Sequence, residues 1–260
     1  MRLRRGRGST DTARMRLSVA VILIASACSA PGCARPSMSN DRFTNPDIAP
    51  LADAVTRGDA AEIRRQAANV DPDTPGADGA TLLVEAIGQG RVESVQALLE
   101  AGADPNRPAM GGETPVHAAA FAKDPQLLRA VLAQGGDADV RNPQTGATPL
   151  VQALLAGNPQ QLRLLLDAGA DPNLADRNDD APLHVAARTN SGAAILQLLD
   201  KGALPQARNS GGATFQDYYF AFQRGVLNER ALAERRQIVA WLKAHNVPLG
   251  PKVEADDLVR

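Results

Sequence analysis

The feature that most constrains this chain is a pattern that returns every 33 or 34 residues over most of its length. The same reference position, usually a threonine, recurs at Thr81, Thr114, Thr148, Ala181 and Thr214. A further copy fits from Ala49, which lies 32 residues before Thr81. A period of this length indicates a small structural unit that is copied and stacked, because one such unit cannot bury its own apolar face.

Each copy predicts two short helices. An apolar residue two positions after the reference and an alanine three positions later share one helix face. These pairs are Leu51/Ala54, Leu83/Ala86, Val116/Ala119, Leu150/Ala153 and Leu183/Ala186. A second apolar stripe begins at Val95, Leu128, Leu162 and Ile195. A glycine, which adopts the left-handed conformation at little cost, then ends the second helix at Gly102, Gly135, Gly169 and Gly202.

The ends of these helices are also marked in the sequence. Threonine is a favoured helix cap and proline suits the first helical turn, as in Thr114-Pro115 and Thr148-Pro149. Lys123 and Asn190 stand where a glycine between the two helices is usual. The polar residues between each terminating glycine and the next reference position predict a hairpin-like finger.

The motifs resemble those of ankyrin repeats. TPVHAAA at 114–120, APLHVAAR at 181–188 and LLxAGADPN at 98–106 and 165–173 carry the resemblance. It implies an all-α fold, an ankyrin-repeat solenoid of about six helix-pair repeats with hairpin-like fingers. The expected domain spans 46–250, with repeats near 49–80, 81–113, 114–147, 148–180 and 181–213, a divergent cap at 214–250, and a flexible tail at 251–260.

The last copy is the most divergent and holds six of the chain's eight aromatic residues. They are Phe215, Tyr218, Tyr219, Phe220, Phe222 and Trp241. We interpret them as a C-terminal cap that seals the end of the stack. The alternative is a partner-binding patch, because exposed aromatic side chains are favoured in binding hot spots. The spacing does not place all of residues 215–222 on one face, so some are expected to be exposed.

The N-terminus has the layout of a secretory signal. Basic residues precede an apolar run from Leu17 to Ala27, which is too short to span a bilayer as a helix. Ala25-Ser26-Ala27-Cys28 resembles a bacterial lipobox, which implies a signal peptide at 1–27, lipidation of Cys28 and a tether at 28–45. Ser29 in place of aspartate implies the outer membrane facing the periplasm. An ordinary Ala-x-Ala cleavage site and a start at Met15 are the alternatives.

Charge argues against nucleic acid as a partner. Residues 1–27 contain six arginines and one aspartate, so the remaining chain carries 22 basic and 28 acidic side chains without a basic stripe. Binding to phosphates requires clustered Lys and Arg. We therefore expect no nucleic-acid partner and contact with the membrane only through an N-terminal lipid.

No motif predicts an enzyme or a cofactor. The sequence has neither a Gly-x-Ser-x-Gly elbow nor a phosphate-binding loop. The three histidines lie 67 and 61 residues apart, which disfavours a metal site. The resemblance implies instead that His117 and His184 hydrogen-bond to the backbone of neighbouring fingers. The aspartate pairs near the fingers lack the pattern of a calcium-binding loop and are expected to stabilise turns.

The resemblance implies a non-catalytic module that binds a protein partner on its concave face. Candidate contact residues at the finger tips are Arg107, Met110, Arg141, Gln144, Asp176, Arg177, Arg208 and Asn209. Candidate contact positions on the first helices are Glu85, Ala118, Gln152 and Val185. Three alternatives remain open: an immunity protein that neutralises a secreted toxic enzyme, an enzyme or carrier with a site in the aromatic-rich last copy, and a structural element of the envelope. No small-molecule substrate is expected.

Overall fold

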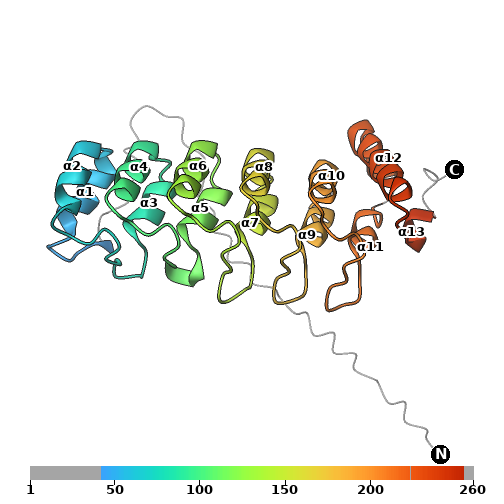
Figure 1. The fold of residues 1–260 in the computed structure, drawn as a ribbon, viewed down its shortest axis with the longest axis horizontal. Helices are drawn as coiled ribbons and strands as arrows, with labels where there is room; N and C mark the ends of the chain where they lie inside the picture. The colour runs from blue at the N-terminus through green and yellow to red at the C-terminus, as the bar shows by residue number, and fades with distance from the viewer. Residues whose placement is uncertain (1–41, 223, 255–260) are drawn as a thin grey trace, which may run out of the picture. The chain divides into compact units, whose positions relative to one another are not determined.

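Six helix pairs follow one another along the chain and stand side by side (Figure 1). The structure is a computed structural model, and it describes residues 42–222 and 224–254. The inner helices, the first of each pair, are α1 (Ala49–Arg57), α3 (Leu82–Gly88), α5 (Pro115–Phe121), α7 (Pro149–Leu155), α9 (Pro182–Arg188) and α11 (Phe215–Tyr219). The outer helices are α2 (Ala60–Ala67), α4 (Val92–Glu100), α6 (Pro125–Ala133), α8 (Pro159–Asp167), α10 (Gly192–Asp200) and α12 (Glu229–Ala244).

Short elements complete the described chain. They are the 3-10 turns η2 (Met110–Gly112) and η3 (Arg224–Val226) and the helix α13 (Pro251–Glu254). Within the described residues every regular element is helical and none is a strand. The predicted all-α solenoid of helix-pair repeats is therefore confirmed.

The fourth pair shows how the local sequence produces the helices. Thr148 has extended backbone angles before α7, and Pro149 occupies the first turn, where a missing N–H costs nothing. Leu150 and Ala153 are both fully buried, as their spacing on one helix face predicts. After α8, Gly169 takes a φ of 93°, a conformation that a side chain would strain.

Stacking joins the pairs into one core. Inner helices pack on inner helices and outer helices on outer helices, in chain order. The conserved spacing of small residues serves this contact, because the four alanines at the inner-helix position are fully buried. They are Ala86, Ala119, Ala153 and Ala186. A larger side chain there would have to push neighbouring helices apart.

Polar bonds also cross between neighbouring pairs. The carbonyl groups at the end of an inner helix have no partner within that helix. Ser94 donates its hydroxyl to the Val55 carbonyl oxygen at 3.1 Å. Asn158 and Gln161 both donate to the Ala122 carbonyl oxygen, at 3.0 and 2.6 Å. Each of these pairs therefore receives donors from the pair that follows it.

The last inner helix, α11, obtains its donors from Arg235 of its own pair. This side chain is only 1% exposed. It donates to the Tyr219 carbonyl oxygen at 2.9 Å and to the Phe222 carbonyl oxygen at 2.7 Å. Its guanidinium group also lies 5.6 Å from the centre of the Tyr219 ring and 5.3 Å from that of Phe220. The long helix α12 thus carries its own means of closing the stack.

Most of the aromatic cluster belongs to this cap. Phe215, Tyr219 and Phe220 are buried, and burial raises the pKa of Tyr219 to about 12. Trp241 donates its indole N–H to the Asp200 carboxylate at 3.1 Å, which links α12 to α10. Phe222 remains 40% exposed, in agreement with the expectation that some of these aromatics face solvent.

Two predicted boundaries need correction. Residues 42 and 43 were expected in the tether, but Phe43 is buried and the Arg42 carbonyl oxygen accepts a bond of 2.8 Å from the Ala77 N–H. Residues 251–254 were expected in a flexible tail, but they form α13 against α11 with Val253 fully buried. In both places one apolar side chain completes the core at an end of the stack. The predicted signal peptide and residues 28–41 lie outside the described residues, and so do residues 255–260.

Across the described residues, every helix is too short or too polar to cross a membrane.

Replacing Arg235 should destabilise the fold through the cap. We expect Arg235→Met to lower the free energy of unfolding by about 1–3 kcal/mol, because two carbonyl groups lose their donors. Chemical denaturation measures the effect. Arg236→Met is the matched control, because Arg236 is adjacent and exposed. Equal stability of the two variants would show that Arg235 does not support the cap.

Candidate protein-binding face

The fingers connect each outer helix to the next inner helix. We define them as residues 71–80, 104–113, 137–147, 171–180 and 204–213, and we call the five together the finger row. At the base of the row, side chains of one finger accept backbone N–H groups of the next. Asp137 donates to Asn106 Oδ1 at 2.7 Å, Asp171 to Asp139 Oδ1 at 2.9 Å, and Leu204 to Asn173 Oδ1 at 2.8 Å. These bonds fix the spacing of the fingers.

The outer parts of the fingers are also linked. The Arg177 N–H donates to the Thr145 carbonyl oxygen and the Ser210 N–H to the Asn178 carbonyl oxygen, both at 3.0 Å. Asn142, which is buried, donates its side-chain amide to the Gly111 carbonyl oxygen at 2.9 Å. The finger row is therefore held along its length by hydrogen bonds between neighbours.

Both histidines of the repeat motif hold fingers in place. His117 Nε2 lies 3.1 Å from the Ala147 carbonyl oxygen, and His184 Nε2 lies 3.1 Å from the Ala213 carbonyl oxygen. Both rings are fully buried. The predicted role in bonding to neighbouring fingers is confirmed. Burial lowers the pKa of His117, and the bond to Ala147 opposes this in part.

The four predicted finger arginines are all exposed. They are Arg107, Arg141, Arg177 and Arg208. Arg141 and Arg177 also reach across to the adjacent finger, where they donate to the carbonyl oxygens of Ala175 and Pro143. Gln144 is exposed as well, and the side chain of Met110 lies outside the described residues. These positions present side chains to solvent from a backbone that is held in place.

Asp176 and Asn209 are half-buried and support the fingers. Asp176 Oδ1 accepts the N–H groups of Asn178 and Asp180 at 2.8 and 3.0 Å. Asn209 Oδ1 accepts the Gly211 and Ala213 N–H groups, both at 3.1 Å. The oxygen atoms of these two side chains are thus engaged in shaping their own turns.

The candidate positions on the inner helices differ from one another. Glu85 is half-buried and accepts Arg42 Nη1 at 3.3 Å, whereas Gln152 donates to Glu113 Oε1 at 2.9 Å. Ala118 is half-buried. Val185 was expected to be available to a partner but is only 3% exposed. Its side chain packs in the core between neighbouring helices.

The sequence analysis did not identify a polar cluster near the last fingers. Arg188 forms an ion pair of 2.6 Å with Asp180, and its guanidinium group lies 5.5 Å from the centre of the Tyr218 ring. Asn209 Nδ2 bonds to Asp180 Oδ1 at 2.8 Å and to the Tyr218 hydroxyl at 2.9 Å. A signal was present, since Asp180 takes the position before the reference residue that alanine occupies at 80, 147 and 213.

Glu113 occupies the same position one finger earlier. Burial raises the pKa of its carboxyl group above the ordinary value. The position equivalent to Arg188 is Phe121 in this pair, and Phe121 is 59% exposed. The two equivalent carboxylates therefore have different neighbours, and the inner-helix side of the row is chemically uneven along its length.

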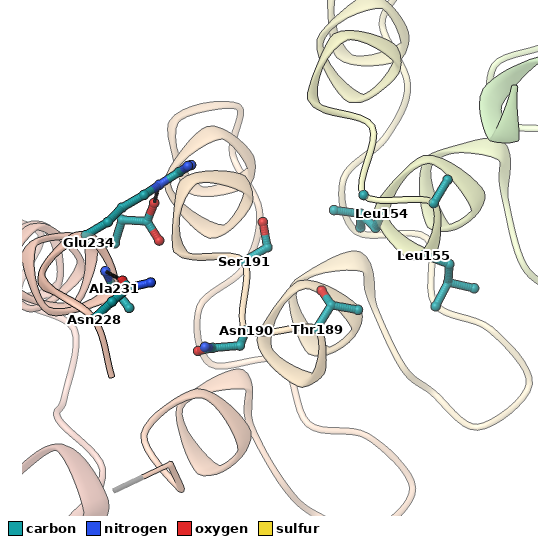
Figure 2. A pocket seen from close by; sticks show the side chains of 11 residues that line it. Leu154, Leu155, Thr189, Asn190, Ser191, Asn228, Ala231 and Glu234 are labelled. Atoms are coloured by element: carbon teal, nitrogen blue, oxygen red, sulfur yellow. Dashed lines mark hydrogen bonds and ion pairs between the residues drawn. The ribbon is translucent and has the colours of Figure 1, made fainter. Parts of the chain in front are cut away.

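A hollow of about 430 Å³ lies at the opposite ends of the inner helices, between α7, the turn after α9, and α12 (Figure 2). Leu154 and Leu155 form one side and Asn228 and Glu234 the other. Glu234 is engaged by Arg230 Nε at 2.9 Å. No histidine or cysteine lines this hollow, so it lacks the nucleophile and base that hydrolytic catalysis would need.

Metal-binding groups were also sought. In residues 42–222 and 224–254 no three His, Cys, Asp or Glu side chains are gathered as a metal ion would require.

Comparison with known proteins agrees with this geometry. The family description "Ankyrin repeats (3 copies)" matches residues 51–142 and 116–209, which together exceed half of the chain. Protein PhlB of Serratia liquefaciens is 42% identical over 140 residues, which is 54% of this chain and 62% of PhlB. The match thus spans less than two thirds of that relative.

Two solved structures are similar. The ankyrin repeat domain of Bcl-3, described as a unique member of the IkappaB protein family, has a TM-score of 0.65 at 27% identity and covers 74% of this chain and 85% of that one. EF0377, an ankyrin repeat protein, has a TM-score of 0.63 at 21% identity and covers 74% of this chain and 97% of that one, a likeness of fold alone.

The buried neutral imidazole of His117 predicts a pH dependence of stability. Its pKa in the folded chain lies below the ordinary 6.5, so in the window below 6.5 the unfolded chain binds more protons than the folded chain. The free energy of unfolding should therefore be highest above pH 6.5. It should fall as the pH decreases towards the folded pKa, by at most about 1.4 kcal/mol per pH unit.

Denaturant titrations between pH 7.5 and 5.5 measure this slope. His117→Gln should have a smaller slope than the natural chain, and His245→Gln, at an exposed histidine, should keep the natural slope. An unchanged slope in His117→Gln would exclude His117 as the titrating group.

Proposed function

We propose a function from the premise that this chain belongs to the ankyrin-repeat family, whose repeats are generally protein–protein interaction modules and whose fold is typically non-catalytic. The proposed function is to bind a protein partner on the finger row and the adjoining surface of the inner helices. Arg107, Arg141 and Gln144 are the proposed centre of this surface. No catalytic step is proposed.

One observation carries the proposal: the finger row exposes side chains on a backbone that neighbouring fingers hold in place. Binding orders flexible groups and costs conformational entropy, so a surface that is already ordered loses less. The large apolar residues of the helices are mostly turned into the core. Polar and charged side chains therefore dominate what the finger row offers, which suits a partner surface that is also polar.

We further propose that the chain is exported and anchored to a membrane by a lipid on Cys28, with the repeats facing the periplasm. The support is the signal-like sequence at 1–27 and the small residues before Cys28. A partner in the same compartment would then meet the finger row near the membrane surface. A soluble periplasmic protein is the alternative if the signal is removed without lipidation.

A photo-crosslinking experiment tests the binding face. A benzophenone amino acid is placed at Gln144, on the finger row, or at Gln160, on the outer helix α8; both positions are exposed. We expect irradiation of cells that make the full chain to give one discrete cross-linked product from position 144 and none from position 160. Mass spectrometry then identifies the partner.

Two results would contradict the proposal. A product of the same mass and yield from both positions would indicate contact unrelated to the finger row. A product from position 160 alone would assign the binding face to the outer helices.

Substitution of Cys28 tests the anchor. Cys28→Ala should move the protein from the membrane fraction to the soluble fraction, because a lipid cannot be attached without the thiol. Cys33→Ala is the matched control, five residues away, and should leave fractionation unchanged. Membrane association that survives Cys28→Ala would rule out this lipid as the anchor.

A further inference from the structure

We infer that the finger row recognises an acidic segment of its partner; this inference rests on the proposed protein-binding function and specifies the chemistry of the partner. One exposed arginine comes from each of four consecutive fingers. They are Arg107, Arg141, Arg177 and Arg208. The chain as a whole is slightly acidic, with a formal net charge of −1, so this row is a local feature and not a consequence of composition.

Other exposed cations of the molecule are paired where the stack needs them. On the outer helices Arg64 bonds Glu100 at 2.7 Å, and Lys201 bonds Asp167 at 2.9 Å, each linking two neighbouring pairs. In the part of the chain that the structure describes, none of the four finger arginines forms an ion pair with a carboxylate. Their charge is therefore available to an external anion.

The carboxylates at the base of the row are already occupied. Asp104, Asp137 and Asp171 each accept the backbone N–H two residues further along, at 2.8, 2.8 and 2.9 Å. Asp180 is neutralised by Arg188. Asp179, exposed in the fourth finger, weakens the positive potential around Arg177. The second and third fingers, with Arg107 and Arg141, thus offer the most positive part of the row.

Three of the arginines are also oriented in advance. Arg141 and Arg177 donate to carbonyl oxygens of the neighbouring finger, and Arg208 donates to the Gly212 carbonyl oxygen at 2.6 Å. A guanidinium group has five N–H donors, so one bond to the fold leaves others free to bind a carboxylate, often with two bonds at once. Holding the side chain in advance reduces the entropy lost on binding.

The spacing of the repeats suggests the form of the acidic segment. Neighbouring helices pack about 8–10 Å apart, so arginines on consecutive fingers recur at roughly this interval. An extended peptide rises about 3.3 Å per residue. Carboxylates at every third residue of an extended segment would therefore keep step with the row. An acidic residue at every third position is the pattern to seek in a partner.

The test uses the full chain and a labelled 12-residue peptide with glutamate at every third position and serine and glycine between. Fluorescence anisotropy at low salt measures binding. We expect the peptide to bind and a peptide with glutamine in place of glutamate to bind at least about ten-fold more weakly. We expect the double variant Arg107→Glu/Arg141→Glu to lose at least about ten-fold in affinity, as the loss of roughly 1.4 kcal/mol of charge attraction would give.

The matched control is Arg129→Glu/Arg163→Glu, which makes the same change of charge at two exposed arginines of the outer helices α6 and α8. This control should alter affinity less than about two-fold if the position of the charges matters. Equal losses in the two double variants would reduce the effect to net charge and overturn the inference. Equal binding of the two peptides, or no binding of the glutamate peptide, would also overturn it.

The cross-linking readout separates this inference from the proposed function. The pair Arg107→Glu/Arg141→Glu is combined with the photo-crosslinker at Gln144. A lost cross-link, with the product retained in the Arg129→Glu/Arg163→Glu background, supports the acidic partner. A cross-link that survives both double variants leaves protein binding on the finger row intact and refutes the acidic chemistry alone.

Discussion

The structure depends on one constraint: a helix pair of this size can complete neither its apolar core nor its hydrogen bonds without a neighbour. The alanine face of each inner helix is buried by the next pair, and carbonyl groups such as those of Val55 and Ala122 receive donors from it. A stack built in this way needs different solutions at its ends. At one end Phe43 and the Arg42 carbonyl oxygen act in place of a preceding pair, and at the other Arg235 replaces donors that a following pair would supply.

The same dependence orders the fingers. A finger alone would be a polar hairpin with few bonds to hold it. In the stack, its backbone donates to Asn106, Asp139 or Asn173 of the preceding finger, and a buried histidine bonds to its last residues in two of the five cases. Helix stacking therefore does more than stabilise the core. It converts mobile loops into a surface with fixed spacing, which is the property that recognition of a partner requires.

Much of the fold could be predicted because the repeat imposes it several times. Six copies with apolar residues and glycines in register leave little freedom in placing the helices, and even Asn190, where glycine is usual, takes the left-handed conformation with a φ of 53°. The ends were harder to predict. Phe43, Arg235 and Val253 occur once each, so no second copy marks them as structural, and a single arginine in a polar helix is ordinarily read as exposed.

The candidate site was predictable in position and less so in chemistry. Finger residues follow from the repeat, but whether a polar side chain is free depends on bonds that sequence does not display. Asp176 and Asn209 shape their own turns, Asp180 pairs with Arg188, and Arg107 has no carboxylate partner among the described residues. Subtracting the groups that the fold uses from those that the fingers carry leaves mainly arginine donors. The chemistry of recognition in a repeat protein is thus set by what its own stacking does not consume.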